Sequence, residues 1–122
     1  FELMAVVNQY KFYGVDDSGT VSPLTMFGTT VVSGVATQNP LVNETYIIKS
    51  IKVTSAGTPT VIIMNNAITT IKTVALAANT TVELLTQPLV VEGGTTLTVQ
   101  SSNTDKFDVA ISYLNIKKET ID

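Results

Sequence analysis

Short stretches in which apolar and polar residues alternate constrain the fold of this chain more than any other feature. In segment 47–53, Ile51 and Val53 fall on one side of an extended strand, and Ser50 and Lys52 fall on the other. Thr, Val and Ile dominate these stretches, and their branched side chains suit a pleated, half-buried surface. Helical spacing is not sustained anywhere. Segments 96–100 and 107–113 repeat the alternation, which predicts that Thr98, Asp108, Ala110 and Ser112 point outward and that Leu97, Val99, Phe107, Val109, Ile111 and Tyr113 point inward.

Turn signals separate these predicted strands. From Tyr46 onward they recur about every 8–15 residues, the spacing typical of a β-sandwich or barrel. Their residues are ones that accept tight or left-handed backbone conformations, and they lie at 16–19 (a predicted hairpin tip), 55–59, 65–66, 78–80, 92–95 and 101–106. The sequence therefore predicts an all-β fold, a single antiparallel β-sandwich of the jelly-roll or Ig-like type.

The strand pattern differs between the first 40 residues and the rest of the chain. Segments 4–15 and 29–35 have strand character, but residues 33–40 read as a connector with little core of its own. We therefore expect residues 1–40 to form an N-terminal arm or edge hairpin beside a sandwich at 41–118. The charged end, 119–122, is predicted to be a frayed tail.

Composition excludes several classes of partner. The chain has 122 residues, the size of one domain, with 14% charged residues and a net charge of −3. Its seven basic residues form no stripe that could neutralise a phosphate backbone, so we expect no nucleic-acid partner. No apolar run approaches the roughly 20 residues that span a bilayer, so we expect no membrane partner.

The side chains used most often in catalysis are missing. The sequence has no histidine and no cysteine, so it lacks the usual general base and the usual zinc or copper ligands. The carboxylates fall at turns or on solvent-facing sides of strands, and Gly93-Gly94 lacks the spacing and lysine of a P-loop. Asp16-Asp17-Ser18-Gly19-Thr20 could hold calcium but lacks the alternation of an EF-hand loop, so a plain turn is favoured. We expect no enzyme activity, no catalytic residue, no metal and no cofactor.

Aromatic residues cluster near the start of the chain, at Tyr10, Phe12 and Tyr13. Exposed aromatic rings can bind sugars, but the chain has no tryptophan, and Phe12 and Tyr13 must point to opposite faces of a strand. Core packing or an interface with another protein is the favoured explanation. We take these three residues as the candidate interface.

Residues 42–116 contain a series of short sequence motifs that resembles the series found in a group of proteins. The motifs are YIIKSIKV (46–53), TVII (60–63), AANTTVELL (77–85) before PLVV (88–91), EGGTTLTVQSS (92–102) and DVAISYLNI (108–116). In this order they resemble the small β-sandwich structural proteins of tailed-bacteriophage virions, of the head decoration, capsid-fibre and neck type. Residues 1–40 have no counterpart in that resemblance.

The resemblance implies a function without catalysis. It implies a structural protein located in the virion, capsid-associated as a decoration or minor capsid subunit, or else a neck, tail or fibre-attachment subunit. The implied partners are other virion proteins and further copies of the chain, with a trimer favoured because capsid lattices present threefold positions. A carbohydrate-binding or adhesion module is the alternative from another class.

Overall fold

The computed structural model describes residues 3–17, 24–65 and 69–121. In this part of the chain every regular element is a β-strand, which confirms the all-β prediction. The strands are β1 (Leu3–Asp17), β2 (Leu24–Val32), β3 (Val35–Asn39), β4 (Glu44–Ser55), β5 (Thr60–Asn65), β6 (Thr69–Ala75), β7 (Thr80–Glu83), β8 (Leu89–Glu92), β9 (Leu97–Ser101) and β10 (Phe107–Ile121).

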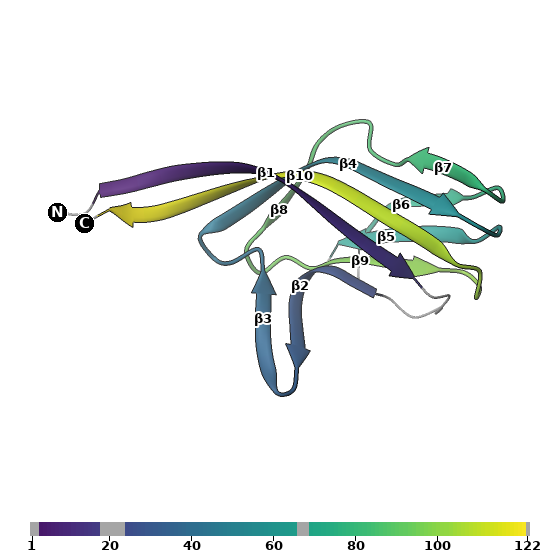
Figure 1. The fold of residues 1–122 in the computed structure, drawn as a ribbon, viewed down its shortest axis with the longest axis horizontal. Helices are drawn as coiled ribbons and strands as arrows, with labels where there is room; N and C mark the ends of the chain where they lie inside the picture. Colours follow the sequence, from purple (N-terminus) through teal and green to yellow (C-terminus); the bar gives the residue numbers. More distant parts are fainter. Residues whose placement is uncertain (1–2, 18–23, 66–68, 122) are drawn as a thin grey trace.

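These strands form two sheets that pack against each other (Figure 1). The first sheet has the order β1-β10-β4-β7, with β8 also paired to β4. The second sheet has the order β3-β2-β9-β5-β6. Every neighbouring pair in both sheets is antiparallel. The predicted antiparallel β-sandwich is therefore confirmed.

Strand pairing is nested from the two ends of the chain inward. β1 pairs with β10, β2 with β9, β4 with β7 and β8, and β5 with β6. The chain thus resembles one long hairpin that has been rolled up, and successive hairpin pairs alternate between the two sheets. That order defines a jelly roll, so of the two predicted sandwich types the structure has the first.

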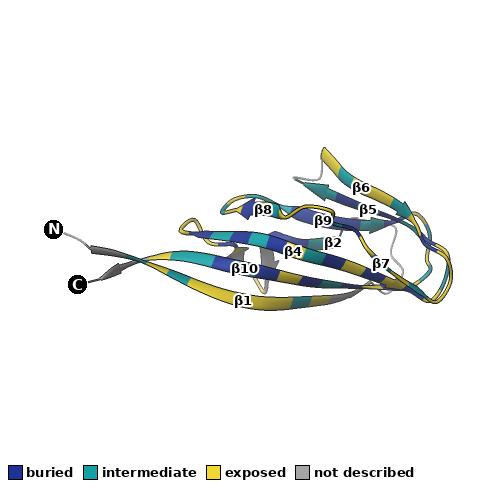
Figure 2. Ribbon diagram, turned by 90° about the horizontal axis from the view of Figure 1, so that it is seen from above, coloured by how far each residue is buried: buried dark blue, intermediate teal, exposed yellow. Residues whose placement is uncertain are grey.

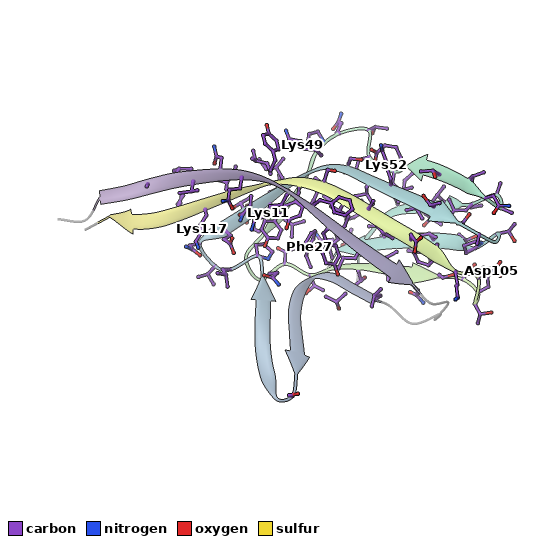
Figure 3. The ribbon with its side chains drawn as sticks, viewed as in Figure 1. Lys11, Phe27, Lys49, Lys52, Asp105 and Lys117 are labelled. Atoms are coloured by element: carbon purple, nitrogen blue, oxygen red, sulfur yellow. The ribbon has the colours of Figure 1, made fainter. Side chains whose placement is uncertain are left out.

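The core lies between the two sheets and is made by the predicted inward rows. Ile51, Val53 and Ile111 of the first sheet and Leu97 and Val99 of the second have no exposed surface. At one end of the core four rings pack together, with centroid distances of 4.6–5.3 Å. The rings belong to Tyr13, Phe27, Tyr46 and Tyr113, and Figure 3 shows Phe27 beneath β10, inside the sandwich.

One predicted outward residue is buried instead. Thr98 is only 4% exposed, although it alternates with the inward residues Leu97 and Val99. The reason is that β9 is an inner strand, with β2 on one side and β5 on the other. Thr98 therefore lies between its cross-strand neighbours Thr25 and Met64, both half-buried, which cover it.

The predicted arm, residues 1–40, contributes to both sheets. β1 forms an edge of the first sheet, while Leu24–Phe27 of β2 pair with β9 inside the second. The predicted hairpin tip at 16–19 lies partly outside the described residues, and the strands on either side of it, β1 and β2, belong to different sheets. Residues 119–121, predicted to fray, continue β10 and pair with β1 as far as Leu3. These pairings join distant parts of the chain, so local sequence patterns do not reveal them.

Two ribbons of paired strands extend past the sandwich. The pairing of β10 with β4 ends at Lys117 and Glu44, whereas β1 and β10 stay paired to Leu3 and Ile121. In the same way, β2 pairs with β9 only as far as Phe27 and then continues with β3 alone. Figure 1 shows both ribbons projecting from the body of the fold.

Candidate assembly surface

The outer face of the first sheet is an apolar surface open to solvent. The register places even-numbered residues of β1 and β10 on this face, together with alternate residues of β4, β7 and β8. We call this surface the outer face. Among the described side chains its larger apolar members are Val6, Tyr10 and Phe12 of β1, Leu114 and Ile116 of β10, Ile47 of β4 and Val90 of β8.

One apolar row crosses four strands of the outer face. Tyr10 is paired with Leu114, Leu114 with Ile47, and Ile47 with Val90. Tyr10 is 81% exposed and Val90 is 51% exposed, whereas Leu114 and Ile47 are half-buried. Figure 2 shows how much of β1 is exposed compared with β4 and β10. Contiguous exposed apolar surface of this kind marks sites of protein interaction more often than scattered single residues do.

Phe12 extends the row along β1. Its side chain is 69% exposed, and its cross-strand neighbour on β10 is Ser112. The ring lies over Gly14, since its Cε1 atom is 3.2 Å from the point where a Cβ on that glycine would stand. Glycine at position 14 therefore leaves room for a ring that lies along the sheet.

The three residues of the predicted interface do not share one face. Tyr10 and Phe12 lie together on the outer face. Tyr13 points to the opposite side of β1, where its ring packs against Phe27 with centroids 5.3 Å apart. The sequence reasoning missed Leu114, Ile47 and Val90, because only the register of β1, β10, β4 and β8 brings them beside Tyr10.

Charged residues surround the apolar row. On β10 the exposed outward charges are Asp108 near one end of the strand and Lys118 near the other. On β4 both Lys49 and Lys52 are exposed and project into solvent (Figure 3). On β8, Glu92 is exposed and pairs in register with Thr45.

Neighbouring groups lower the pKa of Glu83, a carboxylate of β7 at this margin. Desolvation acts to raise its pKa, but hydrogen bonds from the Ser50 hydroxyl and from the amides of Ile51, Leu85 and Leu84 outweigh it and lower the pKa. The Ile51 amide donates to Oε2 at 2.8 Å, and the Leu85 amide donates to the same oxygen at 3.3 Å. The Glu83 carboxylate is therefore engaged in hydrogen bonds with the backbone amides of Ile51 and Leu85.

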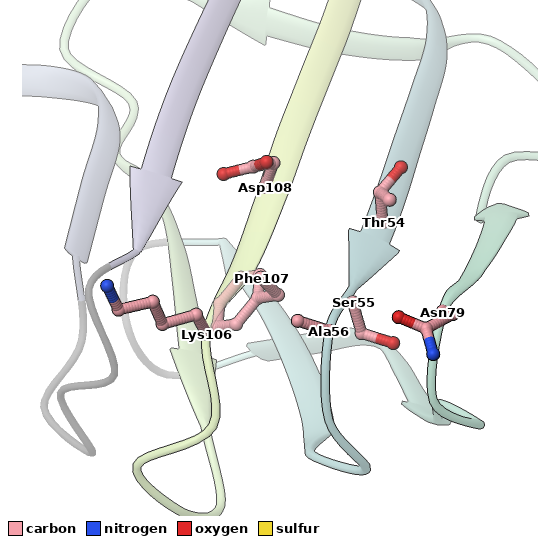
Figure 4. A pocket seen from close by; sticks show the side chains of 7 residues that line it. All are labelled: Thr54, Ser55, Ala56, Asn79, Lys106, Phe107 and Asp108. Carbon is pink, nitrogen blue, oxygen red and sulfur yellow. The ribbon is translucent and has the colours of Figure 1, made fainter.

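A hollow of about 520 Å³ lies at the end of the sandwich where β4 ends and β10 begins (Figure 4). Its hydroxyl groups are engaged in structural hydrogen bonds: Ser55 donates to the Ala77 carbonyl at 2.8 Å, and Thr54 is bonded to Thr81 at 2.9 Å. Figure 4 shows the Lys106 side chain extending away from Ser55 and Asn79. Both hydroxyls are therefore already engaged in hydrogen bonds within the fold.

A polar cluster adjoins the aromatic end of the core. Glu44 is 8% exposed, and its carboxylate accepts hydrogen bonds from the Leu41 amide at 3.0 Å and from Asn115 Nδ2 at 2.8 Å. Burial, together with the charge of Glu44 and the neighbouring Tyr113, raises the pKa of Tyr46 to about 12. Burial and Glu44 also raise the pKa of Tyr113. Both phenols therefore stay protonated at neutral pH, and the cluster fixes β4 to β10.

The described residues bring together no group of three or more acidic side chains that could hold a metal ion. The calcium hypothesis concerned Asp16 to Thr20, whose side chains lie outside the part of the chain that is described. The described residues also form no helix long and apolar enough to cross a bilayer.

Comparison with known proteins adds a structural likeness. No protein-family model and no curated protein matches the sequence. A solved structure of Bacillus endospore appendages, described as a novel family of disulfide-linked pili, is similar to this chain with a TM-score of 0.52 and 10% sequence identity. The likeness covers 94% of this chain and 90% of that chain. It extends over both sheets of the sandwich and supports the fold.

Proposed function

We propose that this chain is a non-enzymatic structural subunit of a tailed-phage virion, attached to the capsid as a decoration or minor capsid protein. The observation that carries the assembly role is the apolar row on the outer face, from Tyr10 through Leu114 and Ile47 to Val90. An apolar surface across four strands costs solubility unless a protein partner covers it. The sequence resemblance supplies the virion as the place of assembly.

The physical character of the chain suits such a subunit. Only 14% of its residues are charged, so wide contacts between subunits leave few charges to desolvate. Jelly rolls are a recurrent architecture of viral capsid proteins, and also of lectins. A neck, tail or fibre-attachment position in the virion remains an alternative within the same proposal.

A pilus subunit is the second candidate, and the likeness to the Bacillus endospore appendages favours it. Both roles need a subunit that assembles with further protein. The appendage proteins form disulfide-linked pili, whereas the 122 residues of this chain contain no cysteine. Joints formed by these residues would therefore rest on noncovalent contacts, such as the outer face provides.

Immunogold electron microscopy and quantitative mass spectrometry of purified particles test the proposal. Label on phage heads with on the order of hundreds of copies supports capsid decoration, and about a dozen copies supports a neck or tail position. Label along cell-surface filaments would replace the virion by the pilus. Absence from both kinds of particle, with specific hits for the purified protein on a glycan array, would overturn the assembly role in favour of the carbohydrate-binding alternative.

A further inference from the structure

We propose that the outer face binds the outer face of a second copy of this chain around a twofold axis that crosses β10 beside Tyr113. This inference rests on the assembly role proposed above and names its partner. The axis lies between the two facing copies, perpendicular to the strands, so β10 of one copy runs antiparallel to β10 of the other. The charge pattern of the outer face supports a second copy over any other occupant.

The outward row of β10 has charges of opposite sign at its two ends. Asp108 stands at one end and Lys118 at the other, ten positions further along, and both are exposed. The outward residues between them, Ala110, Ser112, Leu114 and Ile116, are all uncharged. The midpoint between 108 and 118 is 113. Rotation by half a turn about this midpoint places each Lys118 opposite Asp108 of the second copy.

The same rotation matches the aromatic residues. Tyr10 pairs with Leu114 and Phe12 pairs with Ser112, so the two rings lie at equal register on either side of position 113. Tyr10 of one copy therefore comes opposite Phe12 of the second copy, and the reverse holds too. Sheets pack face to face about 10 Å apart, a distance that these two side chains can fill from both sides. Aromatic residues at the centre and charges at the rim are typical of protein interfaces.

Charges on the neighbouring strands fit the same axis at the rim. Lys52 pairs with Ala110, three positions before the midpoint, and Thr45 pairs with Ile116, three positions after it. Glu92 stands beside Thr45 on the next strand, so Lys52 comes within one strand of Glu92 of the second copy. Lys49 lies on β4 at the level of the axis, so it comes opposite Lys49 of the second copy. These two exposed side chains must turn to solvent at the gap in the sheet between β7 and β8.

Two other modes of self-association fit less well. Addition of a strand to the free edge of β1 would bury Lys11, an exposed charge on the strand of the kind that blunts edges. A threefold ring requires two different patches that complement each other, whereas the outer face complements itself. The contact favoured by these charges is therefore pairwise, in place of the trimer that the sequence resemblance implies.

The first test removes the aromatic centre. Sedimentation equilibrium of the full chain should show a dimer in exchange with the 13.0 kDa monomer. Replacing Tyr10 and Phe12 by serine should raise the dimer dissociation constant at least about tenfold. Val42→Ser is the matched control, because Val42 is 87% exposed but lies before β4 begins, and it should change nothing. An unchanged dissociation constant in the aromatic variant would overturn the proposal.

The second test uses the symmetry itself. The twofold dimer contains two equivalent contacts between positions 108 and 118. Lys118→Glu makes both contacts acid against acid, and Asp108→Lys makes both contacts lysine against lysine. Each variant alone should therefore dimerise about tenfold more weakly. An equimolar mixture of the two variants should recover the wild-type constant, because every contact is then Glu with Lys or Asp with Lys. Each variant's thermal midpoint is measured as the control for folding. Folded variants that fail to recover on mixing would contradict the twofold contact.

The outcomes also separate this inference from the proposed function. A protein that is monomeric at all concentrations, or trimeric and unaffected by these variants, yet is abundant in purified particles, would remove the twofold contact and keep the structural role. A dimer that behaves as expected but is absent from particles and filaments would keep the contact and remove the role.

Discussion

The carboxylate of Glu83 accepts a hydrogen bond from the Ser50 hydroxyl beside the one irregularity of β4. β7 pairs with β4 at residues 52–55, and β8 pairs with it at 45–48, so residues 49–51 have no strand partner on that edge. Glu83 fills this gap: its Oε2 atom accepts from the Ile51 amide at 2.8 Å, while the Leu84 amide donates to the Ile51 carbonyl, also at 2.8 Å. One side chain thereby closes the interval between two short strands.

Glu83 should therefore contribute a pH-dependent part of the stability. Its pKa in the folded chain lies below the ordinary value of 4.5, so its stabilisation is present above about pH 4.5 and is lost as pH falls through the folded pKa. Glu83→Gln should lower the free energy of unfolding at pH 7 by no more than about 1 kcal/mol, because the group is exposed and screened. Urea melts at pH 7 and pH 3 measure this, and the deficit should shrink at pH 3. Glu92→Gln is the control, and a deficit equal at both pH values would refute the charge argument.

A much larger loss of stability is expected from a substitution at Ile111, in the core. Its side chain is fully buried in a row between Tyr13 and Ile51 on the inner face of the first sheet. Ile111→Ala should cost about 2–5 kcal/mol, since the cavity left among β-sheet neighbours cannot collapse completely. Ser112→Ala, one residue along and exposed, should cost far less. Urea unfolding of both variants decides the point, and equal losses would show that the strand faces are assigned incorrectly.

Thr98 offers a substitution that should stabilise the fold. Its Oγ1 atom is buried and has no hydrogen-bond partner among the described residues. Thr98→Val keeps the shape and removes the unpaired hydroxyl, so we expect a gain of about 1 kcal/mol in thermal or urea unfolding. Thr54→Val is the contrasting variant, because it removes a hydroxyl that is exposed and bonded to Thr81. A loss of stability in Thr98→Val would mean that the hydroxyl is satisfied in solution.

The sequence alone predicts what depends on local pattern. Alternation assigns Ile51, Val53, Val99 and Ile111 correctly to the core, because the faces of a strand follow directly from the period of two. It fails at Thr98, where burial is decided by the neighbouring strands to which Thr25 and Met64 belong.

The candidate site on the outer face is likewise only partly predictable from local sequence patterns. Tyr10 and Phe12 stand out in the sequence because they are aromatic and close together. Their apolar neighbours come from β10, β4 and β8, and the pairing of Tyr10 with Leu114 joins residues from the two ends of the chain. Such registers are set by the packing of the whole sandwich, so no local window contains them.

The turn between β8 and β9 carries a further prediction, at Gly93. A Cβ on Gly93 would stand 2.5 Å from the Leu41 carbonyl oxygen and 2.7 Å from the Val42 Cα, so it would meet backbone. That backbone cannot easily withdraw, because the Leu41 amide and carbonyl are both hydrogen-bonded to Glu44, at 3.0 and 2.9 Å, and Glu44 is buried. The turn is thus held against the start of β4.

Gly93→Ala should consequently destabilise the fold by about 1–3 kcal/mol through this forced contact. Gly14→Ala is the matched control, because the close contact of a Cβ there is with the ring of Phe12, a flexible side chain on the outer face that can turn aside, and the Val109 carbonyl oxygen stands 4.0 Å away, an ordinary contact. The control should lose little or nothing in urea unfolding, and its strand position even favours a residue with a side chain. If Gly93→Ala is as stable as Gly14→Ala, the segment before β4 moves freely, and the bonds to Glu44 do not hold it in solution.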